Sequence, residues 1–170
     1  MSRLLLIPVA YLLVLLVSSC GYRVLAETDS LDFRNLHVAP VENRTREPGL
    51  EDLLHRALVE ELALDRRVRV VAREQAEVLL EAAVIRFNLD PTVEKNDIAV
   101  QYEVKLDADF RLVSKESGRV LREISRLGSP ILISFSVDRS ALGTRASQEA
   151  AEIEAARALA RELTNRVLLR

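Results

Sequence analysis

Few residues of this 170-residue chain have the chemistry that catalysis or metal binding needs. His37 and His55 are its only histidines, and Cys20 is its only cysteine. Their positions match no metal motif such as His-x-x-x-His, and a single cysteine excludes both an internal disulfide and a multi-thiolate zinc site. The chain also has no Gly-x-Ser-x-Gly turn and no glycine run of the kind that binds a phosphate. We therefore expect no metal and no cofactor.

Carboxylates offer another route to acid–base chemistry. Asp107 and Asp109 are two residues apart, so on a strand they would share one face and could form a carboxylate pair. Lys105 and Arg111 continue the same spacing, and alternating charges of this kind are more typical of a solvated sheet face. These residues together predict that the chain is not an enzyme.

Arginines are candidates for phosphate binding, because the guanidinium group presents a planar fork of donors. The candidate contacts lie in two segments and are Arg44 and Arg46, then Arg66, Arg67, Arg69 and Arg73. A phosphorylated glycolipid would be a suitable ligand, and the alternative is that these side chains cap helices and keep the domain soluble. The whole chain has 24 basic and 26 acidic residues, which argues against a nucleic-acid partner.

The N-terminus has the pattern of a bacterial lipoprotein leader. Arg3 precedes an uncharged apolar stretch, Leu4–Val17, which is shorter than the ~20 residues that a membrane-spanning helix needs. Small residues then precede Cys20, which resembles a lipobox. We expect residues 1–19 to be a signal peptide that is removed.

Acylation of Cys20 would hold the protein at a membrane that it does not cross. Two or more acyl chains give stable anchoring, because each buried methylene contributes ~0.8 kcal/mol. Gly21 stands where an aspartate commonly signals retention at the inner membrane. We therefore expect a lipid-anchored protein on the periplasmic side of the outer membrane, with residues 20–33 as its lipidated N-terminus and leash.

Hydrophobic periodicity predicts the elements of the first half. Leu50, Leu53, Leu54, Ala57, Leu58 and Leu62 follow helical spacing. The expected elements are a strand Arg34–Val41, a polar turn Glu42–Gly49, a helix over about residues 49–65 with Arg66 and Arg67 at its negative end, a strand Val68–Ala72, a turn at Arg73–Ala76, a strand Val78–Phe87 and a polar loop Asn88–Asp97 around Pro91.

The clearest pattern lies in the second half. Apolar residues occupy every second position from Ile98 to Leu112, and polar residues lie between them from Gln101 to Arg111. This pattern predicts a long strand with one buried and one solvated face. The remaining expected elements are a turn Ser114–Gly118, a strand Arg119–Arg126, an apolar run Ile131–Val137 that either extends the sheet or forms a separate apolar surface, and a helix from an N-cap at Ser147 to about Leu168.

These elements predict one α+β domain over residues 34–170. Two amphipathic helices can close a core against the apolar face of a mostly antiparallel or mixed sheet. We expect a two-layer sandwich of the βαβββα type, with about four strands.

One segment resembles a known family. Cys20-Gly21-Tyr22 after the leader, followed by His37 to Glu51 (HVAPVENRTREPGLE), is similar to the LPS-assembly lipoprotein family LptE. Members carry an Asn-x-Thr-x-Glu-Pro-Gly-Leu-Glu type segment that opens a helix ending in Glu-Glu-Leu, here Glu60-Glu61-Leu62. The resemblance spans nearly the whole domain, although Ile131–Val137 has no place in the family pattern.

The resemblance implies a partner and a cargo. The partner would be the outer-membrane β-barrel LptD, whose lumen the lipoprotein partly plugs, and the cargo would be lipopolysaccharide delivered to the outer leaflet. An activator or assembly factor of the LpoB or CsgG/TolB-N-terminal kind is an alternative, because Asn43-Arg44 and Arg69-Val70-Val71 would serve there too. A third interpretation is a lipid-carrying periplasmic domain that uses Ile131–Val137 as a binding lip.

Overall fold

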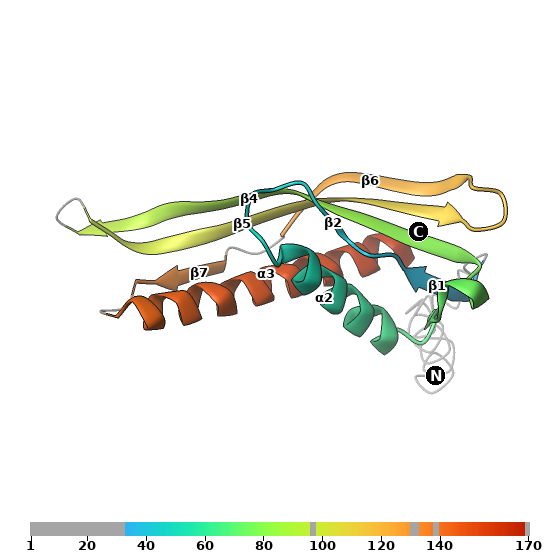
Figure 1. Ribbon diagram of the computed structural model, residues 1–170, viewed down its shortest axis with the longest axis horizontal. Helices are drawn as coiled ribbons and strands as arrows, with labels where there is room; N and C mark the ends of the chain where they lie inside the picture. Colours follow the sequence, from blue (N-terminus) through green and yellow to red (C-terminus); the bar gives the residue numbers. More distant parts are fainter. Residues whose placement is uncertain (1–32, 96–97, 130–132, 138–139, 169–170) are drawn as a thin grey trace, which may run out of the picture.

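The computed structural model describes residues 33–95, 98–129, 133–137 and 140–168. The predicted signal peptide at residues 1–19 and the predicted lipidation site at Cys20 lie outside these ranges. The described chain forms two layers, with a long curled sheet on one side and two helices that cover a single face of it (Figure 1). The predicted α+β class and its two helices are therefore confirmed.

Within the described ranges the sheet has seven strands, so the prediction of about four strands was wrong. Its strands are β1 (Asn35–Val38), β2 (Glu42–Asn43), β3 (Arg69–Val70), β4 (Val78–Lys95), β5 (Ile98–Ser114), β6 (Val120–Gly128) and β7 (Ile133–Ser136). The main order is β3-β1-β4-β5-β6, while β2 pairs with β4 and β7 with β5. The pairs that involve β1 or β2 are parallel and the others antiparallel, so the sheet is mixed.

The hairpin of β4 and β5 is the longest feature of the fold, and it corrects the prediction of a loop at Asn88–Asp97. Its register runs from Val78 opposite Ser114 to Lys95 opposite Ile98. Pro91 lies where β4, among the described residues, pairs with β5 on one side only, and such an edge position is where a sheet accepts proline. Register shifts on both sides of Val93 absorb the irregularity.

The first helix, α2 (Leu50–Leu64), confirms the helix predicted over residues 49–65. Its apolar stripe is buried in the core that α2 shares with α3 and the sheet, and comprises Leu50, Leu54, Ala57, Leu58 and Leu62. Gly49 precedes it with a φ of 90°, a left-handed conformation that glycine adopts without steric cost.

The second helix, α3 (Ala141–Leu168), begins earlier than predicted. Ser140 caps it, since the Ser140 hydroxyl accepts a hydrogen bond of 3.0 Å from the N–H of Gly143. The proposed N-cap Ser147 lies within the helix instead. The sequence signal was weak because residues 141–150 have no continuous apolar stripe, and burial begins only at Ala151.

The apolar run Ile131–Val137 extends the sheet. Its described part, β7, pairs with Gln101–Val104 of β5, and Phe135 stacks on Tyr102 with the ring centroids 5.7 Å apart. Ile133 and Phe135 are buried in the common core, which also includes Phe33 at the start of the described chain.

Candidate functional site

The segment Asn43–Glu51 is held together by side-chain hydrogen bonds. Asn43 donates from Nδ2 to the Glu47 carbonyl at 2.7 Å and to Glu51 Oε2 at 2.6 Å. Its Oδ1 accepts bonds from the Thr45 N–H and hydroxyl at 2.9 and 2.8 Å. Glu51 Oε2 also accepts from the Gly49 N–H at 3.1 Å, which satisfies a donor at the start of α2. The most distinctive part of the sequence therefore has a structural role, joining β2 to α2.

The sheet face that carries no helix is polar and internally paired. Arg86 lies 3.3 Å from Asp107, Lys105 lies 2.8 Å from Asp90, and Arg111 lies 2.7 Å from Glu81. Hydrogen bonding to Asp90 raises the pKa of Lys105 above its usual value. This arrangement is that of a solvated sheet face, as the alternating charges of β5 indicate.

Asp107 and Asp109 do not act as a carboxylate pair. Asp107 pairs with Arg86, whereas Asp109 Oδ1 accepts a 2.8 Å bond from the backbone N–H of Arg126. Each carboxylate thus has its own positively polarised partner.

A groove of about 370 Å³ crosses this polar face between the segment after β1 and strand β6. Its lining residues are Ala39, Pro40, Glu42, Arg44, Glu81, Ala82, Ala83, Asp109, Arg111 and Glu123. Arg44, one of the predicted phosphate contacts, lies in this groove, where it bonds to Glu42 at 2.7 Å and approaches Asp109 at 4.0 Å. The Arg44 bond lowers the pKa of Glu42. Arg44 is therefore already occupied by carboxylates.

Arg67 is occupied as well, in a way that the sequence does not reveal. Its Nε and Nη2 bind the Asp65 carboxylate, and its Nη1 donates to the Leu168 carbonyl at 2.8 Å. Arg122 of β6 donates to the carbonyls of Arg166 and Val167. The two guanidinium groups thus cap the negative end of α3, whereas Arg67 was predicted to complement the end of α2.

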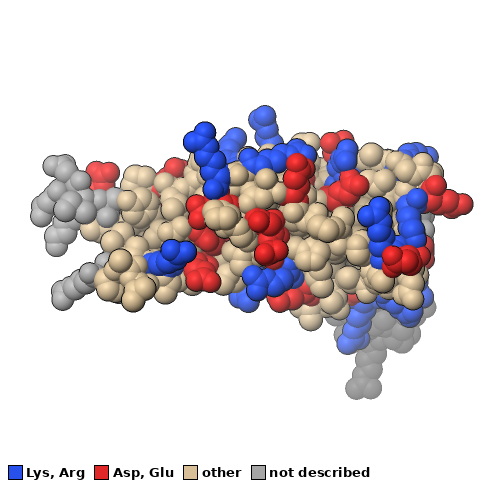
Figure 2. Space-filling view, viewed as in Figure 1, with Lys and Arg blue, Asp and Glu red and all other residues tan. Residues whose placement is uncertain are grey.

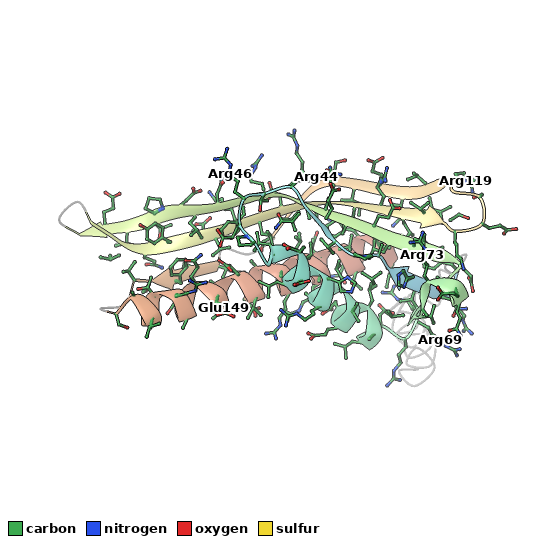
Figure 3. The ribbon with its side chains drawn as sticks, viewed as in Figure 1. Arg44, Arg46, Arg69, Arg73, Arg119 and Glu149 are labelled. Carbon is green, nitrogen blue, oxygen red and sulfur yellow. The ribbon has the colours of Figure 1, made fainter. Side chains whose placement is uncertain are left out.

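The other three arginines of the second segment share one end of the molecule. Arg66 and Arg69 lie on either side of the chain reversal after α2, and Arg73 begins a short 3-10 helix, η1 (Arg73–Gln75). All three side chains are exposed, and none has a carboxylate partner in the described part of the chain. Figure 3 shows Arg69 and Arg73 at this end, far from Arg44 and Arg46, which lie over the middle of the sheet. The structure therefore divides the six predicted contacts into two groups.

The fold brings further basic residues to the same end. The N–H of Arg69 bonds to the carbonyl of Arg34 at 2.7 Å, which places Arg34 beside β3. In the β5–β6 turn, Lys115 donates from its Nζ to the Glu74 carbonyl of η1 at 2.6 Å. Arg119 follows in the same turn and lies near Arg73 in Figure 3. Arg34, Lys115 and Arg119 were not predicted from the sequence, because only strand pairing and a turn place them here.

We call this surface the basic end; it comprises Arg34, Arg66, Arg69, Arg73, Lys115 and Arg119. Figure 2 shows basic side chains at the right-hand end, with acidic ones among them. Unlike the arginines of the polar sheet face, the five arginines of the basic end make no side-chain hydrogen bond or ion pair with any described residue. Their donors are available to an external anion without breaking an existing bond.

Neither histidine contributes to the basic end. His37 Nδ1 donates to the Val71 carbonyl at 3.0 Å, which ties β1 to the chain after β3. His55 lies half-buried on α2. Across the described ranges, no group of three histidine, cysteine or carboxylate side chains is arranged to hold a metal ion. None of the described helices combines the length and the apolar character that crossing a membrane requires.

Several solved proteins have a similar fold. A predicted lipoprotein of Caulobacter crescentus matches with a TM-score of 0.53 at 18% identity, over 75% of this chain and 87% of that one. A Xanthomonas campestris protein matches with a TM-score of 0.57 at 16% identity, over 82% and 86% of the two chains. PelC of Paraburkholderia phytofirmans, solved as a dodecamer, matches with a TM-score of 0.50 at 17% identity, over 78% and 86%. At these identities the likeness is one of fold.

No curated protein sequence matches this chain. A family model described as "LptE: Lipopolysaccharide-assembly" does match, over residues 33–167. The match spans the described strands and both helices apart from the last residue of α3, and it includes the hydrogen-bonded segment Asn43–Glu51. The chain therefore belongs to the LptE family of lipopolysaccharide-assembly proteins.

Proposed function

We propose that the protein is an outer-membrane lipoprotein that works with an LptD-like β-barrel to deliver lipopolysaccharide to the outer leaflet. The family match over residues 33–167 carries this proposal. The position of Cys20 after an apolar leader supports attachment to the membrane through acyl chains. The polar sheet face supports a binding role rather than catalysis, because the carboxylates Glu81, Asp90 and Asp107 on it are paired with basic side chains. We also propose that it is not an enzyme.

Within this function, the phosphates of lipopolysaccharide are the proposed ligands of the predicted arginines that remain unpaired. These are Arg66, Arg69 and Arg73 of the basic end, together with Arg46, which is exposed and without an ion pair in the described structure. Arg44 and Arg67 were predicted in the same role. Their guanidinium groups are bound to carboxylates, so we propose that they support the fold around the contacts.

Recovery of partners with the acylated full chain tests the function. The protein is expressed in a Gram-negative host, crosslinked in the membrane and isolated, with Cys20→Ala as the control that removes the anchor. We expect a large outer-membrane β-barrel with the wild-type chain. Recovery of a peptidoglycan synthase without a barrel would instead favour the activator alternative.

Depletion in the native host supplies the second measurement. The proposal requires that loss of the protein reduces lipopolysaccharide at the cell surface. Restoration by the wild-type chain controls for indirect effects, and normal surface lipopolysaccharide after complete depletion would contradict the proposed delivery role.

A further inference from the structure

The basic end lies where the described chain begins. Phe33 is buried in the core and Arg34 follows directly, so the chain towards Cys20 leaves the domain beside the basic end. Residues 21–32 cannot span more than about 45 Å between Cys20 and Phe33, even when fully extended. The opposite tip of the β4–β5 hairpin is about 55 Å away along the strands. A membrane that holds Cys20 is therefore always within reach of the basic end, whereas the attachment does not by itself bring the distal tip to the membrane.

Charge is distributed unevenly between this end and the rest of the domain. The segments that form the basic end contain seven basic and four acidic residues. The basic residues are Arg34, Arg66, Arg67, Arg69, Arg73, Lys115 and Arg119, and the acidic residues are Asp65, Glu74, Glu77 and Glu116. The remaining described residues include thirteen basic and seventeen acidic side chains. The end nearest the membrane attachment is therefore positive, and the rest of the domain is negative.

We infer that the basic end rests on the anionic phospholipid headgroups of the leaflet that holds the Cys20 acyl chains. The inference rests on the proposed lipid attachment. Phosphate is common to phospholipid headgroups and lipopolysaccharide. While no lipopolysaccharide is bound to Arg66, Arg69 and Arg73, the basic end lies on the phospholipid headgroups because of its place beside the anchor. Five unpaired guanidinium groups from four separate segments can bind phosphates without losing an internal partner. The acidic remainder of the domain is repelled by the same surface, so both halves of the charge distribution favour one orientation.

The orientation can be measured with the full acylated chain in vesicles that lack lipopolysaccharide. Acylation occupies the sulfur of Cys20, so an engineered cysteine is the single free thiol for a fluorophore. Ser117→Cys places the label in the β5–β6 turn at the basic end, and Thr92→Cys places it on the distal part of β4. Quenching by a headgroup-labelled lipid reports which label lies close to the membrane. Vesicles of phosphatidylethanolamine and phosphatidylglycerol are compared with phosphatidylcholine vesicles.

We expect strong quenching at position 117 and weak quenching at position 92 in the anionic vesicles only, with the difference lost at high salt, where charges are screened. Each basic residue near such a surface contributes about fivefold to the equilibrium constant, so Arg69→Gln, Arg73→Gln and Arg119→Gln together should reduce the ratio of oriented to unoriented protein on the order of a hundredfold. Arg46→Gln, Arg126→Gln and Arg145→Gln form the matched control, because these arginines are exposed and lie outside the basic end. The control should retain the orientation.

Three outcomes would overturn the inference: equal quenching at both positions, an orientation that survives the triple change, or an orientation that appears only when lipopolysaccharide is added. In each of these the chain still binds vesicles through its acyl chains, so the proposed function stands. Failure of the acylated chain to associate with any vesicle would count against the lipid attachment itself, and the inference would fall with it.

Discussion

Arg67 and Leu168 are 101 positions apart in sequence, yet the Nη1 of Arg67 donates to the Leu168 carbonyl at 2.8 Å. The same guanidinium binds Asp65 through Nε and Nη2 and lowers the pKa of that carboxyl group. The chain reversal after α2 is thereby fastened to the C-terminal end of α3. Arg122 supports the same helix end through the carbonyls of Arg166 and Val167.

Arg67→Ser should lower the free energy of unfolding by about 1.5–3 kcal/mol, because it removes a charged hydrogen bond to a helix terminus and leaves Asp65 without its partner. Denaturant titration of the full chain measures the change. Arg66→Ser is the matched control, since the neighbouring arginine is exposed and unpaired within the described structure, and it should change stability by less than about 0.5 kcal/mol. Equal effects of the two substitutions would contradict a capping role for Arg67.

Asn43→Ala should cost about 2 kcal/mol, because it breaks the network that joins β2 to α2. Asn43→Asp keeps the size of the side chain but replaces the donating amide with a second carboxylate facing Glu51. We expect this variant to be less stable than the alanine variant at neutral pH and to recover as the carboxylates are protonated. Thermal unfolding at two pH values separates the variants, and a stable Asn43→Asp protein would argue against the assigned bonds.

The combined substitution of Arg66, Arg69 and Arg73 by serine should weaken binding to purified lipopolysaccharide. Electrostatic contacts with phosphates are screened by salt, so the loss should be largest at low ionic strength and small near 1 M salt. Arg67 is kept in this variant, because its removal would disturb the fold as well as the charge. Titration of the full chain at several salt concentrations provides the measurement, and unchanged affinity would leave these arginines with a role in solubility alone.

The environment of Glu152 predicts that the stability of the protein falls as the pH rises. Burial, and then the nearby carboxylates Glu47 and Glu149, raise the pKa of Glu152 above its usual value. The folded state therefore favours the protonated form of Glu152. The stability that protonated Glu152 contributes is fully present below the pKa that its carboxyl group has in the unfolded chain. It is lost as the pH rises through the higher pKa that the group has in the folded protein. Glu152→Gln should raise stability at pH 7 by up to about 1 kcal/mol and leave it unchanged under acidic conditions.

The neighbouring position Glu154 provides the control for this comparison. It is half-buried and forms a surface ion pair with Arg157, at 3.9 Å, so Glu154→Gln should have little effect at either pH. Stability curves of the three proteins between pH 4 and pH 8 test the prediction. A wild-type protein whose stability relative to Glu152→Gln does not fall with rising pH would refute it.

The long elements were predictable because their hydrophobic patterns repeat without a break over many residues. The alternation from Ile98 to Leu112 became β5, and the helical spacing of the leucines became α2. Strands β2 and β3 have two residues each, which is too short for a period to appear. Pro91 and its polar neighbours suggested a loop, although pairing with β5 extends β4 through them. Local preference was overridden there by a partner strand.

The basic end was half predictable for a similar reason. Arg66, Arg69 and Arg73 are close in sequence, so their proximity needed no knowledge of the fold. Arg34 and Arg119 reach the same surface only through the parallel pairing of β1 with β3 and through the β5–β6 turn. The sequence could not show which arginines have partners within the protein, because Arg67 and Arg111 find theirs through tertiary contacts with Leu168 and Glu81.

The parallel pairing of β1 has a consequence for the order of folding. The β4–β5 hairpin joins residues that are close in sequence around its turn, and such contacts form early because little loop entropy is lost. Strand β1 pairs with β3 and β4, both of which follow it in the chain. When the chain is synthesised from its N-terminus, β1 must therefore wait for strands that follow it. The first strand of the sheet to appear is among the last to gain its partners.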